Sequence, residues 1–175
     1  NAESTGGFKK QLVKYAARIN ADMVAIVGEN RTLSYYGLES LNKSPRVGII
    51  YLLNSAGIKN RSSLGQEHYF DRKITISDVV FSIGPKINAA GRIDTATDSV
   101  RLLISDNKDN ATRLGSQINE LNLTRRKLDA NITREALQLL VSENKSGAGE
   151  KITSIVYNAN WHKGVVGIVA SAMSI

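Results

Sequence analysis

The sequence predicts an α/β protein that is mostly helical over this stretch. From about Lys108 to Asn144 apolar residues recur at alternating steps of three and four, and no Gly or Pro interrupts them after Gly115. This pattern predicts one helix of roughly 37 residues, or about 55 Å. Short helical patterns precede it. After it, Lys151 to Tyr157 alternates like a strand and leads into a second helical pattern that contains glycines.

Composition restricts the class of protein. The chain has 175 residues, of which 42% are apolar, and this is enough for a substantial core. It contains no cysteine, which excludes disulfides and thiolate metal sites. No signal peptide or membrane span is recognisable, so we expect a soluble protein with the cytoplasm as the default compartment. The net charge of +7 favours a polyanionic partner without identifying it.

The short helices before the long one are predicted from their apolar stripes and their terminal residues. A turn at Gly28 to Arg31 separates the first two, and Thr75 or Ser77 is expected to cap the fourth. The polar stretch from Ile58 to Lys73 has no period and predicts a surface loop or insertion. The predicted helices are Phe8 to Asn20, Thr32 to Asn42, Val47 to Ala56, one ending at Phe81, and Thr95 to Ile104.

The segment from Ile83 to Asp94 is the part that packing explains least. Two glycines and a proline predict an irregular segment rather than a helix or a central strand. Its small residues would leave backbone N–H groups uncovered, and its cations could then meet an anion. The alternative is a tight turn in which Arg92 pairs with Asp94. The predicted phosphate-binding residues are Lys86, Asn88, Gly91 and Arg92.

Two isolated side chains are weak candidates for metal ligands. Asp22 lies inside an apolar run, where a helix cap or a satisfied hydrogen bond is the more common role of an aspartate. His68 lies beside Glu67 and Asp71 in the polar stretch, where a solvated side chain is the usual outcome.

A basic patch, Arg125, Arg126 and Lys127, lies near the middle of the long helix. It can attract a nucleic-acid backbone if it faces a cleft between two domains. The alternative is solvation, with side-chain pairing to Glu120 or Asp129.

The last part of the chain combines a predicted strand with a glycine-bearing helix start. Free N–H groups and the helix dipole converge at such a junction, which makes it a natural anion site. The alternative is a histidine that caps the helix and packs beside Trp161. The candidate residues here are His162, Lys163, Gly164 and Gly167.

Three motifs in chain order carry a resemblance: Gly84-Pro-Lys-Ile-Asn-Ala-Ala-Gly-Arg92, Leu121-Asn-Leu-Thr-Arg-Arg126 and Trp161-His-Lys-Gly-Val-Val-Gly-Ile-Val-Ala-Ser171. Together they resemble the RecJ family of single-strand-specific DNA exonucleases, within the DHH phosphoesterase superfamily. The resemblance implies that residues 1–105 are the C-terminal part of a DHH domain and that residues 106–146 are a connecting helix. Residues 147–175 would then begin a truncated DHHA1-type domain.

The resemblance also implies a function. The family degrades single-stranded DNA from the 5′ end with Mn²⁺ or Mg²⁺, in a cleft between the two domains. We expect roles in DNA repair and recombination, with a single-strand-binding protein or a helicase as protein partners. By position, the resemblance assigns metal binding to Asp22, the catalytic handling of phosphate to Asn88 and Arg92, and a catalytic position facing the cleft to His162 with Gly164 and Gly167.

The chain also departs from the family. The aspartate-rich motifs and the Asp-His-His triplet are absent, and Ala25 and Ala172 stand where proline and arginine are usual. We therefore predict that these residues alone do not hydrolyse DNA, because one carboxylate cannot assemble a two-metal site. Two alternatives stay open. One is a DHH phosphoesterase acting on short oligonucleotides or cyclic dinucleotides, and the other is a non-catalytic replication scaffold.

Overall fold

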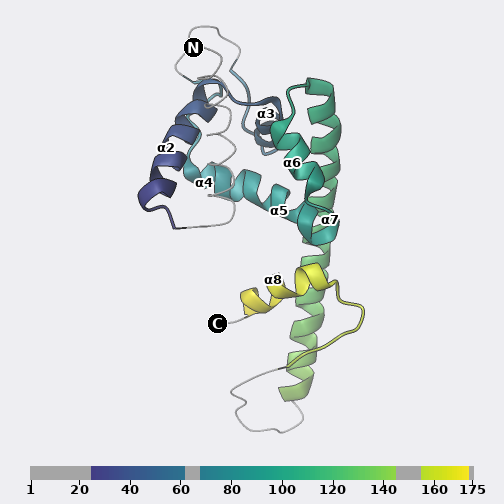
Figure 1. Cartoon of the computed structure of the whole chain (residues 1–175). Coiled ribbons are helices and arrows are strands. Elements are labelled where there is room, and N and C mark those ends of the chain that lie inside the picture. Colours follow the sequence, from purple (N-terminus) through teal and green to yellow (C-terminus); the bar gives the residue numbers. More distant parts are fainter. Residues whose placement is uncertain (1–24, 62–67, 145–154, 174–175) are drawn as a thin grey trace. The chain divides into compact units, whose positions relative to one another are not determined.

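In the computed structural model, the structure describes residues 25–61, 68–144 and 155–173. Every regular element in these ranges is helical (Figure 1), and one isolated antiparallel bridge joins Asn60 to Phe70. The mostly helical fold predicted from the sequence is therefore confirmed. The elements are α2 (Gly28–Lys43), α3 (Val47–Asn54), α4 (Ile76–Asp78), the π-helical segment η1 (Val79–Ile83), α5 (Gly84–Ile93), α6 (Thr97–Ile104), α7 (Lys108–Asn144) and α8 (Lys163–Met173).

The chain divides into two compact units, Asn1–Asn122 and Leu123–Ile175, and the boundary lies within α7. The first turns of α7 thus belong with the preceding helices, and the rest of α7 belongs with α8. The predicted domain limits at residues 105 and 146 stay a prediction. No helix within the described ranges is both long and apolar enough to cross a bilayer.

Most of the predicted short helices are confirmed, with small shifts at their ends. α3 and α6 are each two residues shorter than expected. The expected turn at Gly28 to Arg31 is wrong, because α2 already begins at Gly28. Gly28 has φ +51°, which glycine adopts without strain, so the chain enters the helix directly from the extended residue Val27. The helix predicted at Phe8 to Asn20 lies outside the described residues.

The core of the first unit is formed by apolar side chains of α2, α3, η1, α5, α6 and the beginning of α7. Leu52 on α3, Leu102 on α6 and Leu114 on α7 are fully buried in it. α3 and α6 approach closely at Gly48, where a Cβ atom would collide with the backbone carbonyl oxygen of Leu102. The packing of α3 on α6 therefore requires glycine at this position.

The stretch predicted as a surface loop at Ile58 to Lys73 is only partly one, since Phe70 is fully buried in the core. Asn42 at the end of α2 holds the segment that follows Phe70. The Ile74 N–H donates to Asn42 Oδ1 at 2.7 Å, and Asn42 Nδ2 donates to the Ile74 carbonyl oxygen at 3.0 Å. Single anchoring side chains give no sequence period, which explains the mistaken prediction. Residues 62–67 lie outside the described residues.

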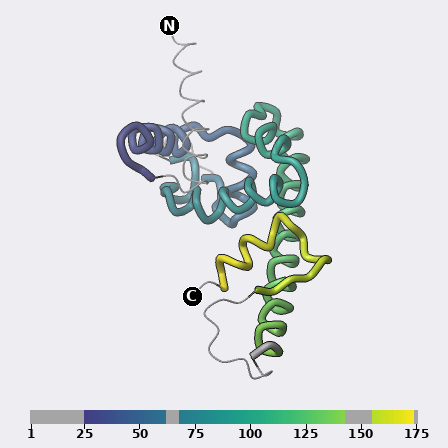
Figure 2. Tube along the Cα trace, turned by 60° about the horizontal axis from the view of Figure 1, so that its bottom comes forward, coloured from purple at the N-terminus to yellow at the C-terminus, as the bar shows by residue number. Residues whose placement is uncertain are grey.

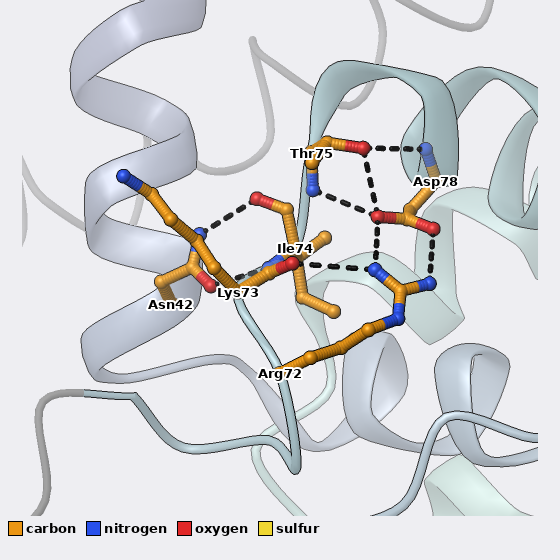
Figure 3. A network of polar contacts seen from close by, with 6 residues as sticks. All are labelled: Asn42, Arg72, Lys73, Ile74, Thr75 and Asp78. Carbon is orange, nitrogen blue, oxygen red and sulfur yellow. Dashed lines mark hydrogen bonds and ion pairs between the residues drawn. The ribbon is translucent and has the colours of Figure 1, made fainter.

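A polar network fixes the start of α4 (Figure 3). Thr75 is the N-cap, as predicted, and forms a capping box with Asp78. Arg72 binds both carboxylate oxygens of Asp78, at 2.7 and 2.5 Å. The hydrogen bonds from Arg72, followed by those from Thr75, hold the pKa of the Asp78 carboxyl well below its usual range, although partial burial opposes the shift. This network sets where the next helical run begins.

α4, η1 and α5 follow one another without a break from Ile76 to Ile93 (Figure 2), so the predicted irregular segment at Ile83 to Asp94 is wrong. Gly84 has helical angles of φ −50° and ψ −53°, and its N–H donates to the Val79 carbonyl oxygen five residues earlier. Pro85 lies in the first turn of α5 and, having no N–H, donates no hydrogen bond back to η1. The wider π turn before it also accommodates the proline ring, which would clash in a regular α-helix.

The long helix is confirmed with both predicted ends, since α7 runs from Lys108 to Asn144. In the second unit, α8 lies beside the α7 residues of the same unit (Figure 1), and Val165 and Val169 are buried. Of the strand predicted at Lys151 to Tyr157, residues 151–154 lie outside the described residues, and residues 155–157 have no regular structure.

Candidate nucleic-acid interface

Helix α5 presents two of the predicted phosphate-binding side chains on one face. Asn88 and Arg92 are four residues apart, which places them next to each other on a helix. Asn88 is half-buried, whereas Arg92 and the neighbouring Gly91 are exposed. An amide and a guanidinium arranged in this way can both donate to the oxygens of a phosphodiester.

Lys86 lies on the same helix but its ammonium reaches into the fold. The residue is 7% exposed, and its Nζ donates to the Leu52 carbonyl oxygen at 3.3 Å and to Ser55 Oγ at 2.5 Å. Both acceptors lie at the C-terminal end of α3, where a positive charge is favourable. A contact between Lys86 and a phosphate would require the ammonium to leave these acceptors. The geometry therefore favours a structural role that joins α5 to α3.

The small residues of the motif have a packing role. Ala89 and Ala90 are fully buried, and the Ser99 hydroxyl of α6 donates to the Ile87 carbonyl oxygen at 3.1 Å. The prediction that alanines leave the backbone uncovered for an anion is therefore wrong at these two positions. They allow α5 to lie close to its neighbours, which fixes the face that carries Asn88 and Arg92.

The basic patch predicted on α7 is divided between two environments. Arg125 Nη1 lies 3.6 Å from Asp129 Oδ2, and the two side chains are 14% and 27% exposed. Pairing with Asp129 is the alternative that the sequence analysis sets against binding of a nucleic-acid backbone. Arg126 and Lys127 are exposed, so they are the members of the patch that an anion can approach.

His162 caps α8. Its Nδ1 accepts a hydrogen bond from the Gly164 N–H at 3.1 Å, and its carbonyl oxygen accepts from the Val165 and Val166 N–H groups at 2.9 and 3.2 Å. Three N–H groups that were expected to converge on an anion are therefore directed at His162 itself. With Nδ1 acting as an acceptor, the neutral imidazole carries its proton on Nε2, which provides one further donor.

The other candidates of this motif are accessible. Lys163 and Gly167 are exposed, and apart from the adjoining part of α8 itself no atom lies within 4 Å of the position that a Cβ would take at Gly167. An apolar cavity of about 450 Å³ opens between α7 and α8, with Ile132, Trp161 and Val169 in its lining. The open surface at Gly167 allows a close approach to the α8 backbone.

A residue that the sequence analysis did not single out connects α7 to this motif. Glu135 Oε2 accepts from Trp161 Nε1 at 2.8 Å and from Asn158 Nδ2 at 3.5 Å. A glutamate on the surface of a charged helix has no distinguishing mark in sequence, so only the spatial pairing with Trp161 reveals it.

The described residues do not assemble a metal site. No group of three or more His, Cys, Asp or Glu side chains with suitable geometry occurs among them. His68 lies in the described part of the chain and belongs to no such group, whereas Asp22 lies outside it. The assignment of Asp22 as a metal ligand stays a prediction.

Known proteins match nearly the whole chain. The single-stranded-DNA-specific exonuclease RecJ of Salmonella typhimurium is 36% identical over 152 residues, which are 86% of this chain and 24% of that protein. RecJ of Haemophilus influenzae is 33% identical over 173 residues, 97% of this chain and 28% of that protein. No family model matches the chain.

Solved structures share the fold. Thermus thermophilus RecJ in complex with Mn²⁺ superposes with a TM-score of 0.72 at 27% identity, over 94% of this chain and 22% of that one. The chain belongs to the RecJ family. It spans about a quarter of the length of the RecJ proteins that it matches. A second structure, of exonuclease RecJ bound to manganese, gives a TM-score of 0.71 and 27% identity over 94% of this chain and 37% of that one.

Proposed function

We propose that this chain holds the DNA strand in a 5′-to-3′ exonuclease specific for single-stranded DNA, with roles in DNA repair and recombination. The observation that carries the proposal is the match to RecJ exonucleases at 30 to 36% identity over at least 86% of the chain. The net charge of +7 agrees with a polyanionic ligand.

The residues divide into those that meet the strand and those that support them. Arg92, with Asn88 beside it, is proposed to donate to the phosphate backbone, because both lie on one accessible face of α5. His162 is proposed to offer its Nε2–H, and Arg126 to add charge along the strand. Lys86 is proposed to have a structural role, in which its ammonium joins α5 to α3 and does not contact the strand.

The hydrolysis itself is proposed to need Mn²⁺ or Mg²⁺, which supplies charge neutralisation at the phosphate. RecJ structures in complex with Mg²⁺ and with Mn²⁺ support this proposal. Because the described residues hold no suitable cluster of ligands, most ligands would have to come from elsewhere in the protein, with Asp22 as one of them. The 175-residue chain alone is accordingly proposed to be inactive.

The test compares substrates and variants in the full-length protein. We expect release of nucleotides from 5′-ended single strands, and Arg92→Ala should weaken single-strand affinity and lower the slope of log affinity against log salt by about 0.7. The free energy of unfolding should change by no more than about 1 kcal/mol, because Arg92 is exposed and contacts of exposed charges are screened by solvent. Cleavage of cyclic dinucleotides alone would refute the proposal in favour of the oligonucleotide phosphoesterase alternative.

A further inference from the structure

The turn before α8 is fixed to α7 through one carboxylate. Asn158 and Trp161 both donate to Glu135 Oε2, and the indole contact is the shorter, at 2.8 Å. Within the turn, the Trp161 N–H donates to the Asn158 carbonyl oxygen at 3.1 Å, and the Asn160 N–H donates to Asn158 Oδ1 at 2.9 Å. The turn is therefore tied both to itself and to α7.

The indole contact has two components. A hydrogen bond to an ionised carboxylate is shorter and stronger than one between neutral groups, which agrees with the 2.8 Å distance. The Trp161 ring also lines the apolar cavity together with Ile132 and Ala136 of α7, which lie on either side of Glu135 in sequence. The polar edge and the apolar face of one side chain thus fix its position on α7.

His162 follows Trp161 directly and precedes the first residue of α8, so its position at the N-terminus of the helix depends on the contact between Trp161 and Glu135. Its ring is held by the Gly164 N–H, and its carbonyl oxygen is held by two N–H groups of the first turn. These contacts fix both the direction of the imidazole and the nitrogen that carries the proton.

We propose that Glu135 is the positioning residue for His162. By holding Trp161 against α7, it keeps the imidazole on the cap of α8 as a neutral donor through Nε2–H. This inference rests on the proposed function, in which that donor meets the DNA strand. Glu135 itself touches neither the strand nor the reacting phosphate.

The first test is spectroscopic and independent of activity. Nitrogen NMR of the full-length protein, with isotope-labelled tryptophan and histidine, would follow the Trp161 indole and both imidazole nitrogens of His162. The signals are assigned from Trp161→Phe and His162→Ala. We expect Glu135→Ala to shift the indole signal and to mix the two imidazole tautomers. Glu135→Gln retains an acceptor oxygen and should restore both signals. Unchanged His162 signals in Glu135→Ala would overturn the proposal.

The second test is kinetic. Glu135→Ala should lower kcat/KM on single-stranded DNA by up to about 100-fold, mainly through kcat, because a displacement of about 1 Å can have that effect. In a His162→Ala background the same change should cause no further loss. Glu120→Ala, an exposed glutamate on the same helix, is the matched control and should leave the rate unchanged.

The outcomes distinguish the positioning role of Glu135 from the proposed contact between His162 and DNA. A full additional loss from Glu135→Ala in the His162→Ala background would overturn the positioning role. If His162→Ala alone leaves hydrolysis unchanged, the proposed contact between His162 and DNA fails. The spectra then still decide whether Glu135 sets the imidazole.

Discussion

Asp78→Asn is the most informative perturbation of the first unit, because Asp78 connects the cap of α4 to Arg72 (Figure 3). The change removes the charge and leaves a single acceptor oxygen, whereas the carboxylate accepts hydrogen bonds from both Arg72 and Thr75. Loss of a capping interaction costs about 1 kcal/mol. The ion pair adds at most about 1 kcal/mol, since Arg72 is 51% exposed and screened by solvent. We expect the free energy of unfolding to fall by about 1 to 2 kcal/mol near neutral pH.

The same residue predicts a pH dependence. The pKa of Asp78 is depressed in the folded state, so the unfolded chain binds more protons as the solution becomes acidic. The stabilisation is therefore complete above the unfolded pKa of about 3.9 and is lost as the pH falls through the lower folded pKa. Urea unfolding curves at neutral pH and at about pH 3 should show a smaller difference for Asp78→Asn than for the parent protein.

Asp71→Asn is the matched control, because Asp71 is a nearby exposed carboxylate outside the capping box. It should change stability by no more than about 0.5 kcal/mol. Equal losses for Asp71→Asn and Asp78→Asn would refute the reasoning, because they would show a general effect of charge rather than a specific network.

Three further substitutions separate packing from binding. Gly48→Ala should destabilise the protein by about 3 kcal/mol in urea unfolding, since its Cβ would meet the Leu102 backbone, and a neutral result would contradict the described packing of α3 on α6. Gly167→Ala should raise stability by up to about 1 kcal/mol because it improves helix propensity in open space. Its single-strand affinity should nevertheless fall if the strand approaches the α8 backbone, and unchanged affinity would remove Gly167 from the interface. Lys86→Met should lower stability by about 2 kcal/mol while the salt dependence of DNA binding stays the same, and a reduced salt slope would return Lys86 to the phosphate-binding set.

Periodic patterns were the reliable part of the sequence. α7 was predicted with both ends because one apolar stripe continues through it and its neighbours bury that stripe. The helical structure around Pro85 is not predictable from the sequence. A proline is compatible with a helix when a π turn precedes it, and no local sequence pattern indicates such a turn.

For the candidate site, the sequence proposes residue types but does not give the directions of their side chains. The sequence pointed to both Lys86 and Arg92 as phosphate-binding cations, yet Lys86 is buried against α3 and Arg92 is exposed. His162 was expected either to bind an anion or to cap a helix, and the contacts to Gly164 and Val165 show the cap. Glu135 depends on a partner 26 positions away, which no local pattern contains.

The π turn at η1 has a consequence for how the α5 face is specified. A π turn accommodates one more residue than an α turn, so deleting one residue from Val79–Ile83 would return the run to regular α geometry. Pro85 would then follow a regular α turn, in which its ring clashes with the carbonyl oxygen four residues earlier. The run would kink or break before Asn88 and Arg92, although the sequence from Gly84 to Ile93 is unchanged. The orientation of the motif is thus encoded in residues that precede it.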